Sequence, residues 1–225
     1  MSGEKTGLIL AGGPLNLAFA EPFIRKQSYS WIVTADAGLS VCMELSLKPD
    51  LAVGDFDTLG RQRMEEIRKS TGWEFEVHSP QKDETDMELA VGAVLRAGCR
   101  KVHVLGATGG RLDHELSNVL LMLWARRQGL SMELYDERNR LFLLEAPEDS
   151  GTRFLKKEAY GSYVSFLPLT EQVKGITLTG FRYPLTKKDL SIFENPGLCV
   201  SNELEEQEAR LFFEEGALIC VESKD

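Results

Sequence analysis

Acidic side chains in the first half of the chain have the spacing expected of a metal site. Asp55 and Asp57 directly follow the apolar run 51–53 and its glycine, and Asp83 and Asp86 stand three residues apart at a predicted helix start. Residues two apart in an extended segment point to the same side, and residues three apart on a helix share a face. Two carboxylates about 4 Å apart in a shielded cleft repel each other by roughly 4 kcal/mol. Such a group needs cations, and Mg²⁺ is the expected one, because it binds carboxylate oxygens together with substrate phosphates.

Two further acids follow other predicted strands. Asp36 comes after the second strand and Asp113 after the fifth, and both could join the same group. In an open parallel sheet, ligands bind in the crevice beyond the carboxyl ends of the strands. We therefore expect these acids, although distant in sequence, to lie on one rim of the sheet. The alternative for each Asp taken alone is an ordinary turn or N-cap acid.

A glycine pair beside the acids could bind phosphate. Gly109 and Gly110 precede Arg111 and a predicted helix, where backbone N–H groups can approach an anion and the helix N-terminus favours negative charge. Arg111 could contact a phosphate through two hydrogen bonds. Lys82 is a second candidate, with a solvated lysine as the alternative, and His114 could act as a general base or cap the helix. With no nucleophilic Ser/His/Asp or Cys/His set in the sequence, the expected chemistry is phosphate transfer by charge and positioning.

Strand-like and helix-like segments alternate through the first two-thirds of the chain. The strands are predicted at 7–10, 30–35, 51–53, 74–78, 101–105 and 131–135. The clearest helices are predicted at 86–97, where Thr85 and Glu88 form a capping-box pattern, and at 115–128. This alternation predicts an α/β domain over 1–146, with a mostly parallel sheet and helices on both faces.

The pattern changes after residue 146. The segment 146–151 is rich in turn residues and is a candidate linker. Short β-rich runs follow at 162–167, 176–179, 198–201 and 209–221, and the last of these is predicted to be a hairpin that turns at 214–216. We therefore predict a small all-β domain over 151–225.

Composition excludes several classes of protein. The 225 residues carry 26 Lys and Arg against 35 Asp and Glu, a net charge of −9, so a uniformly basic nucleic-acid binder is excluded. The sequence has no apolar run of about 18 residues, which predicts no membrane span. The four cysteines are far apart and form no CxxC pair, as expected of reduced, buried thiols in a cytoplasmic protein.

Taken together, these residues give the chain a resemblance to the thiamine pyrophosphokinase family. The matching stretches are Ala35-Asp36-Ala37-Gly38, Gly54-Asp55-Phe56-Asp57-Thr58, Lys82-Asp83-Glu84-Thr85-Asp86, Gly109-Gly110-Arg111-Leu112-Asp113-His114 and Ser201-Asn202-Glu203. They stand in the family's order and span most of the chain. Thr58 replaces the family's usual Ser but keeps its hydroxyl, and Ala37 replaces a Gly or Ser.

The resemblance implies a fold, a reaction and an assembly. The fold is an α/β catalytic domain followed by a β-sandwich that binds thiamine. The reaction transfers a pyrophosphoryl group from ATP to the thiamine hydroxyl, giving thiamine diphosphate and AMP. The assembly is a homodimer with each active site between the α/β domain of one subunit and the β domain of the other.

The resemblance also implies roles for individual residues. The catalytic aspartates, which serve Mg²⁺ and ATP, would be Asp55, Asp57, Asp83 and Asp86, with Asp55, Asp57 and Asp83 as metal ligands. The nucleotide would be bound by Asp36, Lys82, Gly109, Gly110, Arg111, Asp113 and His114. Thiamine would be bound by Ser201 and Asn202, and the thiamine hydroxyl proton could pass to Asp83 or Asp86.

Three other functions remain open from the residues alone. A Mg²⁺-dependent nucleotide pyrophosphohydrolase would use the same acids with water as the nucleophile, but it needs no second acceptor domain. A non-catalytic nucleotide sensor could be built on the same sheet. A sugar-nucleotide transferase with a DxD motif would explain Asp55 and Asp57 but not the Gly-Gly-Arg loop.

Overall fold

The computed structural model describes residues 4–57, 60–79, 81, 83–146 and 151–225. The chain divides into two compact units, Met1–Glu137 and Arg138–Asp225. Among the helices in these described ranges, none combines the length and the apolar character that crossing a bilayer requires.

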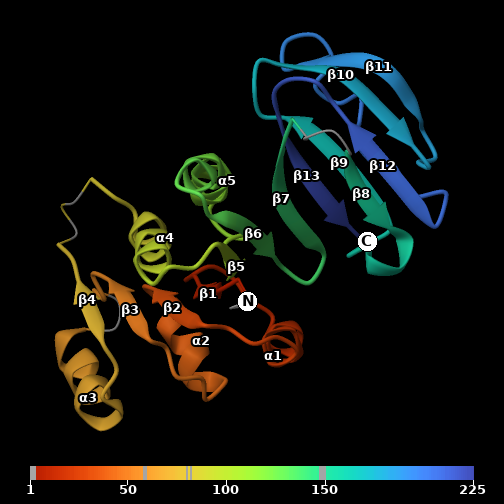
Figure 1. The fold of residues 1–225 in the computed structure, drawn as a ribbon. Helices are drawn as coiled ribbons and strands as arrows, with labels where there is room; N and C mark the ends of the chain where they lie inside the picture. Colours follow the sequence, from red (N-terminus) through yellow and green to blue (C-terminus); the bar gives the residue numbers. More distant parts are fainter. Residues whose placement is uncertain (1–3, 58–59, 80, 82, 147–150) are drawn as a thin grey trace. The chain divides into compact units, whose positions relative to one another are not determined.

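The first unit contains a parallel sheet with the strand order β4-β3-β2-β1-β5-β6 (Figure 1). Its strands are β1 (Thr6–Leu10), β2 (Trp31–Ala35), β3 (Leu51–Gly54), β4 (Phe75–Val77), β5 (Lys101–Leu105) and β6 (Ser131–Tyr135). Every one of these neighbouring pairs is parallel. The strand order reverses between β1 and β5, and ligands bind at such a switch point in open α/β sheets.

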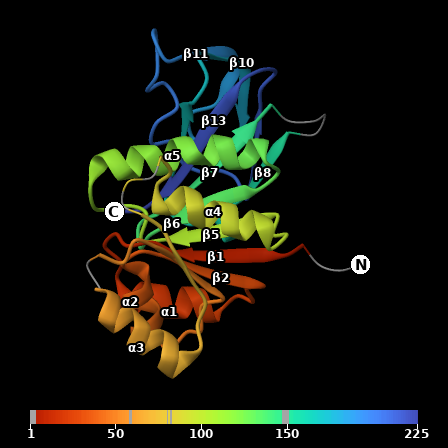
Figure 2. The same cartoon turned by 90° about the vertical axis from the view of Figure 1, so that its left-hand side faces the viewer.

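Helices cover both faces of this sheet, as the sequence predicted. They are α1 (Leu17–Arg25), α2 (Gly38–Glu44), α3 (Arg61–Thr71), α4 (Asp86–Arg96) and α5 (Leu112–Arg127). Figure 2 shows α4 and α5 on one face and α1, α2 and α3 on the other. The two helical layers bury β1 from Gly7 onward, and Leu8, Ile9 and Leu10 have no exposed surface. Such a continuous apolar run is typical of a parallel strand that is covered on both sides.

The start of α4 is fixed by the capping box that the sequence predicted. The Thr85 hydroxyl accepts a hydrogen bond from Glu88 N at 3.2 Å, and the Glu88 carboxylate accepts one from Thr85 N at 2.6 Å. Two N–H groups at the start of the helix are thereby satisfied. This cap sets where the first turn of α4, with Asp86 in it, begins.

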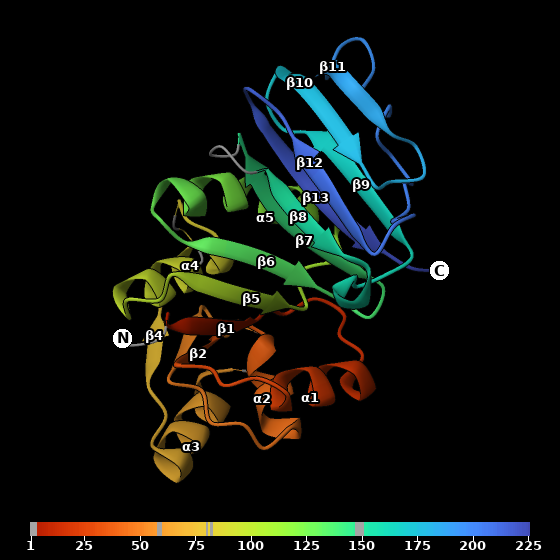
Figure 3. The ribbon, with the colours of Figure 1, turned by 45° about the vertical axis from the view of Figure 1, so that its right-hand side comes forward.

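The second unit is a β-sandwich, as the family resemblance implied. Its strands are β7 (Asn139–Glu145), β8 (Thr152–Leu155), β9 (Tyr163–Pro168), β10 (Gln172–Thr179), β11 (Leu185–Ser191), β12 (Glu208–Phe212) and β13 (Ala217–Ser223), with a 3₁₀ turn, η1, at Lys156–Glu158. One antiparallel set runs β7-β13-β9 and the other β11-β10-β12-β8 (Figure 3). A core that includes Phe166, Leu178, Leu211 and Leu218 joins residues of both sheets.

Three details of the second half differ from the sequence prediction. The run 209–221 is not a hairpin: β12 pairs with β10 and β8, whereas β13 pairs with β7 and β9. The run 198–201 forms turns, not a strand. The units divide after Glu137, ahead of the boundary predicted at 146, because β7 pairs along its whole length with β13. The expected linker residues 147–150 lie outside the described residues.

Candidate active site

A cleft of about 560 Å³ lies beyond the carboxyl ends of β1, β2, β3 and β5 in the first unit. The starts of α4 and α5 complete it. Its lining residues are Ala11, Gly12, Gly13, Pro14, Ala35, Asp36, Asp55, Glu84, Thr85, Asp86, Met87, Gly106, Ala107, Thr108, Gly110, Arg111, His114, Glu115, Ser117 and Asn118. The cleft therefore spans the β1/β5 switch point, where the fold predicts a ligand site.

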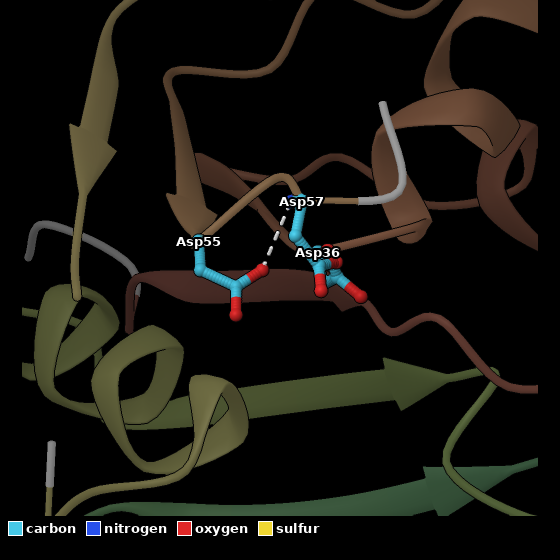
Figure 4. A group of neighbouring side chains, drawn as sticks. All are labelled: Asp36, Asp55 and Asp57. Carbon is cyan, nitrogen blue, oxygen red and sulfur yellow. Dashed lines mark hydrogen bonds between the residues drawn. The ribbon is translucent and has the colours of Figure 1, made fainter. Parts of the chain in front are cut away.

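Three carboxylates gather at this rim. Asp36, Asp55 and Asp57 each offer an oxygen, and these oxygens all lie within 4.8 Å of one another (Figure 4). The Asp55 carboxylate also accepts a hydrogen bond from Asp57 N at 3.1 Å, which fixes the turn between them. Phe56, between the two acids, is buried and packs edge-on against Phe75. This packing turns the flanking carboxylates outward.

The negative charges of the clustered carboxylates repel one another, and a bound cation would offset this repulsion. Burial raises the pKa of Asp36 above its ordinary value, and the charges of Asp86, Asp55 and Asp57 raise it further, against a backbone hydrogen bond from Ala37 that lowers it. Among the lining residues that the structure describes, the acids are Asp36, Asp55, Glu84, Asp86 and Glu115, whereas Arg111 is the one Lys or Arg. A crowded set of carboxylate oxygens is the donor set that divalent hard cations prefer. The residues present therefore fit a divalent metal ion.

The raised pKa of Asp36 predicts a change in stability. A carboxyl with a raised folded-state pKa contributes stability at low pH and loses it as pH rises through that pKa. In metal-free buffer, we expect Asp36→Asn to unfold at a higher temperature than wild type, with a gap that widens from about pH 4 to about pH 7. The gain should be about 2–4 °C for each kcal/mol of relieved repulsion. Calorimetric melts across pH measure it, and a variant that melts lower at neutral pH would contradict the electrostatic picture.

Two acids in the first turn of α5, Asp113 and Glu115, hold the glycine-rich loop that precedes the helix. Gly110 N donates to Glu115 Oε1 at 2.8 Å. The Arg111 guanidinium donates to both oxygens of Asp113, at 3.1 and 2.6 Å. This bidentate contact lowers the pKa of the exposed Asp113. Asp113 thereby holds Arg111 at the edge of the cleft. A guanidinium can contact a phosphate in the same bidentate way.

The floor of the cleft has no room for a side chain at two of its glycines, Gly13 and Gly106. A Cβ on Gly13 would lie 2.4 Å from Gly106 O, and one on Gly106 would lie 2.7 Å from Ala11 O. The backbones after β1 and β5 are therefore in close contact. A smooth floor of this kind lets a ligand approach the main chain closely.

The structure brings together most of the site residues that the sequence predicted. Those at the cleft or in its acid cluster are Asp36, Asp55, Asp57, Asp86, Gly110, Arg111 and His114. Asp83, Gly109 and Asp113 are exposed and do not line the cleft. Lys82 lies outside the described residues. Ser201 and Asn202 belong to the second unit, where Ser201 is exposed and Asn202 is buried.

Sequence reasoning missed several lining residues on the first turns of α5. Glu115, Ser117 and Asn118 all face the cleft, and the buried Asn118 amide donates to Ala107 O at 3.0 Å. The prediction started this helix at 115, but α5 begins at Leu112. An earlier start puts the 114, 117 and 118 positions on one face. That helical spacing was the available signal.

Comparisons with known proteins agree with the site. A family model described as "Thiamin pyrophosphokinase, catalytic domain" matches residues 25–134, and one described as "Thiamin pyrophosphokinase, vitamin B1 binding domain" matches residues 152–218. The thiamine pyrophosphokinase of Bacillus subtilis (strain 168) is 32% identical over 221 residues, which cover 98% of this chain and 100% of that protein.

Solved structures give the same result. The thiamine pyrophosphokinase structure from Bacillus subtilis has a TM-score of 0.84 at 29% identity and covers 98% of this chain and 100% of its own. The structure from Geobacillus thermodenitrificans has a TM-score of 0.82 at 31% identity, with 98% of each chain covered. Sequence, fold and cleft thus agree, and the chain belongs to the thiamine pyrophosphokinase family of diphosphotransferases.

Proposed function

We propose that this chain transfers a pyrophosphoryl group from ATP to the hydroxyl of thiamine, with Mg²⁺ as its metal ion and with thiamine diphosphate and AMP as products. The observation that carries the proposal is the convergence of Asp36, Asp55 and Asp57 on one rim of the cleft. These acids come from two different strand ends, and the starts of α4 and α5 complete the same cleft. An acidic cleft with a helix N-terminus in its wall suits a metal-bound triphosphate and a cationic acceptor.

Asp55, Asp57 and Asp36 would hold the metal ion, with Asp83 as a further proposed ligand. When bound, Mg²⁺ would offset the charge of the triphosphate beside these carboxylates. The N-terminal turn of α5 and Arg111 would bind the phosphate oxygens, and Gly109 lets the loop turn with a φ of +80°. Lys82, Asp113 and His114 remain proposed nucleotide contacts.

The direction of transfer follows from which bond breaks. The thiamine oxygen forms a bond to the β-phosphorus of ATP while the bond from that phosphorus to the α–β bridging oxygen breaks, so AMP leaves. The hydroxyl proton needs an acceptor within hydrogen-bond reach. Asp86 is the favoured acceptor over Asp83, because it lines the cleft.

One assay separates this function from its alternatives. Purified protein is incubated with ATP and Mg²⁺, with and without thiamine, and AMP and thiamine diphosphate are measured. We expect AMP to form only with thiamine and in equal amount to thiamine diphosphate. AMP formed equally well without thiamine would indicate a pyrophosphohydrolase, and nucleotide binding without AMP would indicate a sensor.

The proposal includes a homodimer with the active site completed at the subunit interface. An apolar stripe on α5 supports it: Leu112, Leu116, Leu120 and Trp124 recur every four residues and are all exposed. Exposed apolar patches of this kind mark protein interfaces. A cytoplasmic location is also proposed, since Cys42, Cys99, Cys199 and Cys220 are all buried and free of disulfides.

The stripe predicts the effect of a charge at its centre. Leu120 is 63% exposed, so Leu120→Glu should leave the fold intact but put a charge into the subunit interface. We expect wild type to have the mass of a dimer by light scattering and this variant that of a monomer. Val77→Glu, at an exposed apolar residue outside the stripe, is the control and should remain dimeric. A monomeric wild type, or a dimeric Leu120→Glu, would refute this interface.

A further inference from the structure

The buried face of α5 carries one polar side chain among apolar ones. This helix buries Asn118, Leu121, Met122 and Ala125, and Asn118 is 8% exposed. Asparagine is a poor residue for a helix interior, and burying an amide without hydrogen-bond partners is costly. Packing alone therefore does not favour Asn118 at this position, whereas its place in the wall of the cleft suggests a contact with a ligand.

One hydrogen bond fixes the direction of the Asn118 amide. Its Nδ2 donates to Ala107 O at 3.0 Å. A backbone carbonyl oxygen only accepts, so the amide nitrogen must face Ala107 and the amide oxygen must face away from it. None of the described residues donates a hydrogen bond to Asn118 Oδ1. This oxygen is also not one of the buried side-chain atoms that are closed off from solvent, so it is an acceptor that opens into the cleft.

An open acceptor at this place does not suit the charged parts of a nucleotide. Phosphate oxygens are themselves acceptors near neutral pH, so they cannot donate to Asn118 Oδ1. Water on a metal ion could donate, but the acid cluster is too far away. Ala107 follows β5 and Asp36 follows β2, with β1 between these two strands. At about 4.8 Å per strand, the two places are roughly 10 Å apart.

The nucleoside half of ATP does supply donors, because it carries the adenine 6-amino group and the ribose hydroxyls. The cleft beside Asn118 suits such a group: Ala11 and Ala107 line it and are buried, and Gly106 contributes bare backbone to its floor. Asn118 stands six residues after Leu112, where α5 begins, which is about 9 Å along the helix. A nucleotide with its phosphates at the start of α5 can therefore place its nucleoside at Asn118.

We propose that Asn118 recognises the nucleoside of ATP. Its Oδ1 accepts a hydrogen bond from the adenine 6-amino group or from a ribose hydroxyl, while its Nδ2 stays bonded to Ala107 O. This inference rests on the proposed function, which supplies ATP as the ligand. Asn118 is then a specificity-determining residue, because a nucleotide that lacks the donor leaves the acceptor unpaired once water is excluded. Ser201 and Asn202 of the second unit remain the proposed thiamine contacts.

Nucleotide binding in the absence of thiamine tests the proposal, because it does not depend on transfer. Dissociation constants are measured by titration calorimetry with Mg²⁺ for ATP and for three analogues that each lack one donor. These are purine riboside triphosphate, which has no 6-amino group, 2′-deoxyATP and 3′-deoxyATP. We expect wild type to bind at least one of them roughly tenfold more weakly than ATP, the effect of one buried group left unpaired. The analogue affected identifies the donor as adenine or ribose.

Asn118→Ala should abolish this preference. The variant also loses the bond to Ala107 O, so its affinity for every nucleotide can fall together. The readout is therefore the ratio of the analogue and ATP dissociation constants, which should drop from about ten to about one. Asn118→Asp keeps an acceptor oxygen and should keep the ratio, even where its charge weakens all binding. Gln128→Ala is the control and should keep the wild-type ratio, because it removes an exposed amide at the far end of α5, outside the cleft.

The outcomes separate this inference from the proposed function. Wild type that binds all three analogues as tightly as ATP would overturn the role of Asn118, and this result needs no variant to fold. A wild-type ratio in Asn118→Ala would also overturn it, above all if the thiamine KM rises instead. Wild type that shows the preference but forms no thiamine diphosphate would overturn the proposed reaction and leave the nucleoside contact in place.

Discussion

Asp55→Asn should lose at least about a thousandfold in thiamine-dependent AMP formation, the cost of removing one charge contact of roughly 4 kcal/mol at the reacting centre. The fold should survive, because the asparagine Oδ1 can still accept the hydrogen bond that Asp57 N now donates to Asp55. The variant keeps the size and the turn of the wild type. Only the charge that would face the proposed metal ion and triphosphate is lost.

Glu44→Gln is the matched control for this change. Glu44 is an exposed carboxylate at the end of α2 and does not line the cleft. Turnover by initial-rate assay, with circular dichroism melts of both variants, separates loss of chemistry from loss of fold. Wild-type turnover in Asp55→Asn, or an equal loss in Glu44→Gln, would remove Asp55 from the reacting centre.

Gly38→Ala should cause the largest loss of stability among single changes near the cleft. A Cβ at this position would lie 1.9 Å from Leu10 O and 2.6 Å from Leu10 C, so the backbone of β1 or α2 must move. Overpacking of about 3 kcal/mol would lower the melting temperature by about 6–12 °C in a chain of this size. Activity should fall as well, because Asp36 precedes Gly38 by two residues and would shift with the start of α2.

Gly92→Ala is the control for the glycine substitution. Gly92 lies inside α4, and the nearest atom to an added Cβ is the flexible Arg96 Nη1 at 3.4 Å. Alanine favours a helix interior over glycine by roughly 1 kcal/mol. Thermal melts should show Gly92→Ala at or above wild type and Gly38→Ala far below it. Equal melting of the two variants would disprove the tight approach of α2 to β1.

The sequence predicted the parallel sheet and the acidic rim because both depend on local signals. Apolar runs end at the residues where the strands end, and the Thr85–Glu88 capping box marks the start of α4. Strand order was not needed to expect Asp36 and Asp55 on one rim, since every parallel strand of a sheet ends at the same side. Asp83 does not directly follow a strand but lies in the loop before α4. It is exposed and is not one of the three clustered acids.

The missed features depend on contacts that a sequence window does not contain. The residues of β12 and β13 alternate like a hairpin, but a sandwich can place consecutive strands in opposite sheets, as their pairings show. The strand β11 is mostly exposed and carries Lys187, Lys188 and Asp189, so it has no apolar pattern to detect. The helix α5 has no side-chain cap at Arg111, so its start gave no capping signal, and only the helical spacing of 114, 117 and 118 indicated it.

Anomalous X-ray scattering from crystals soaked with Mn²⁺ and a non-hydrolysable ATP analogue tests the central claim most directly. The account predicts one or more Mn²⁺ peaks within bonding distance of the carboxylates of Asp55 and of Asp36 or Asp57, with the triphosphate running toward the start of α5. Peaks confined to other parts of the chain, with the triphosphate bound away from this cleft, would contradict it.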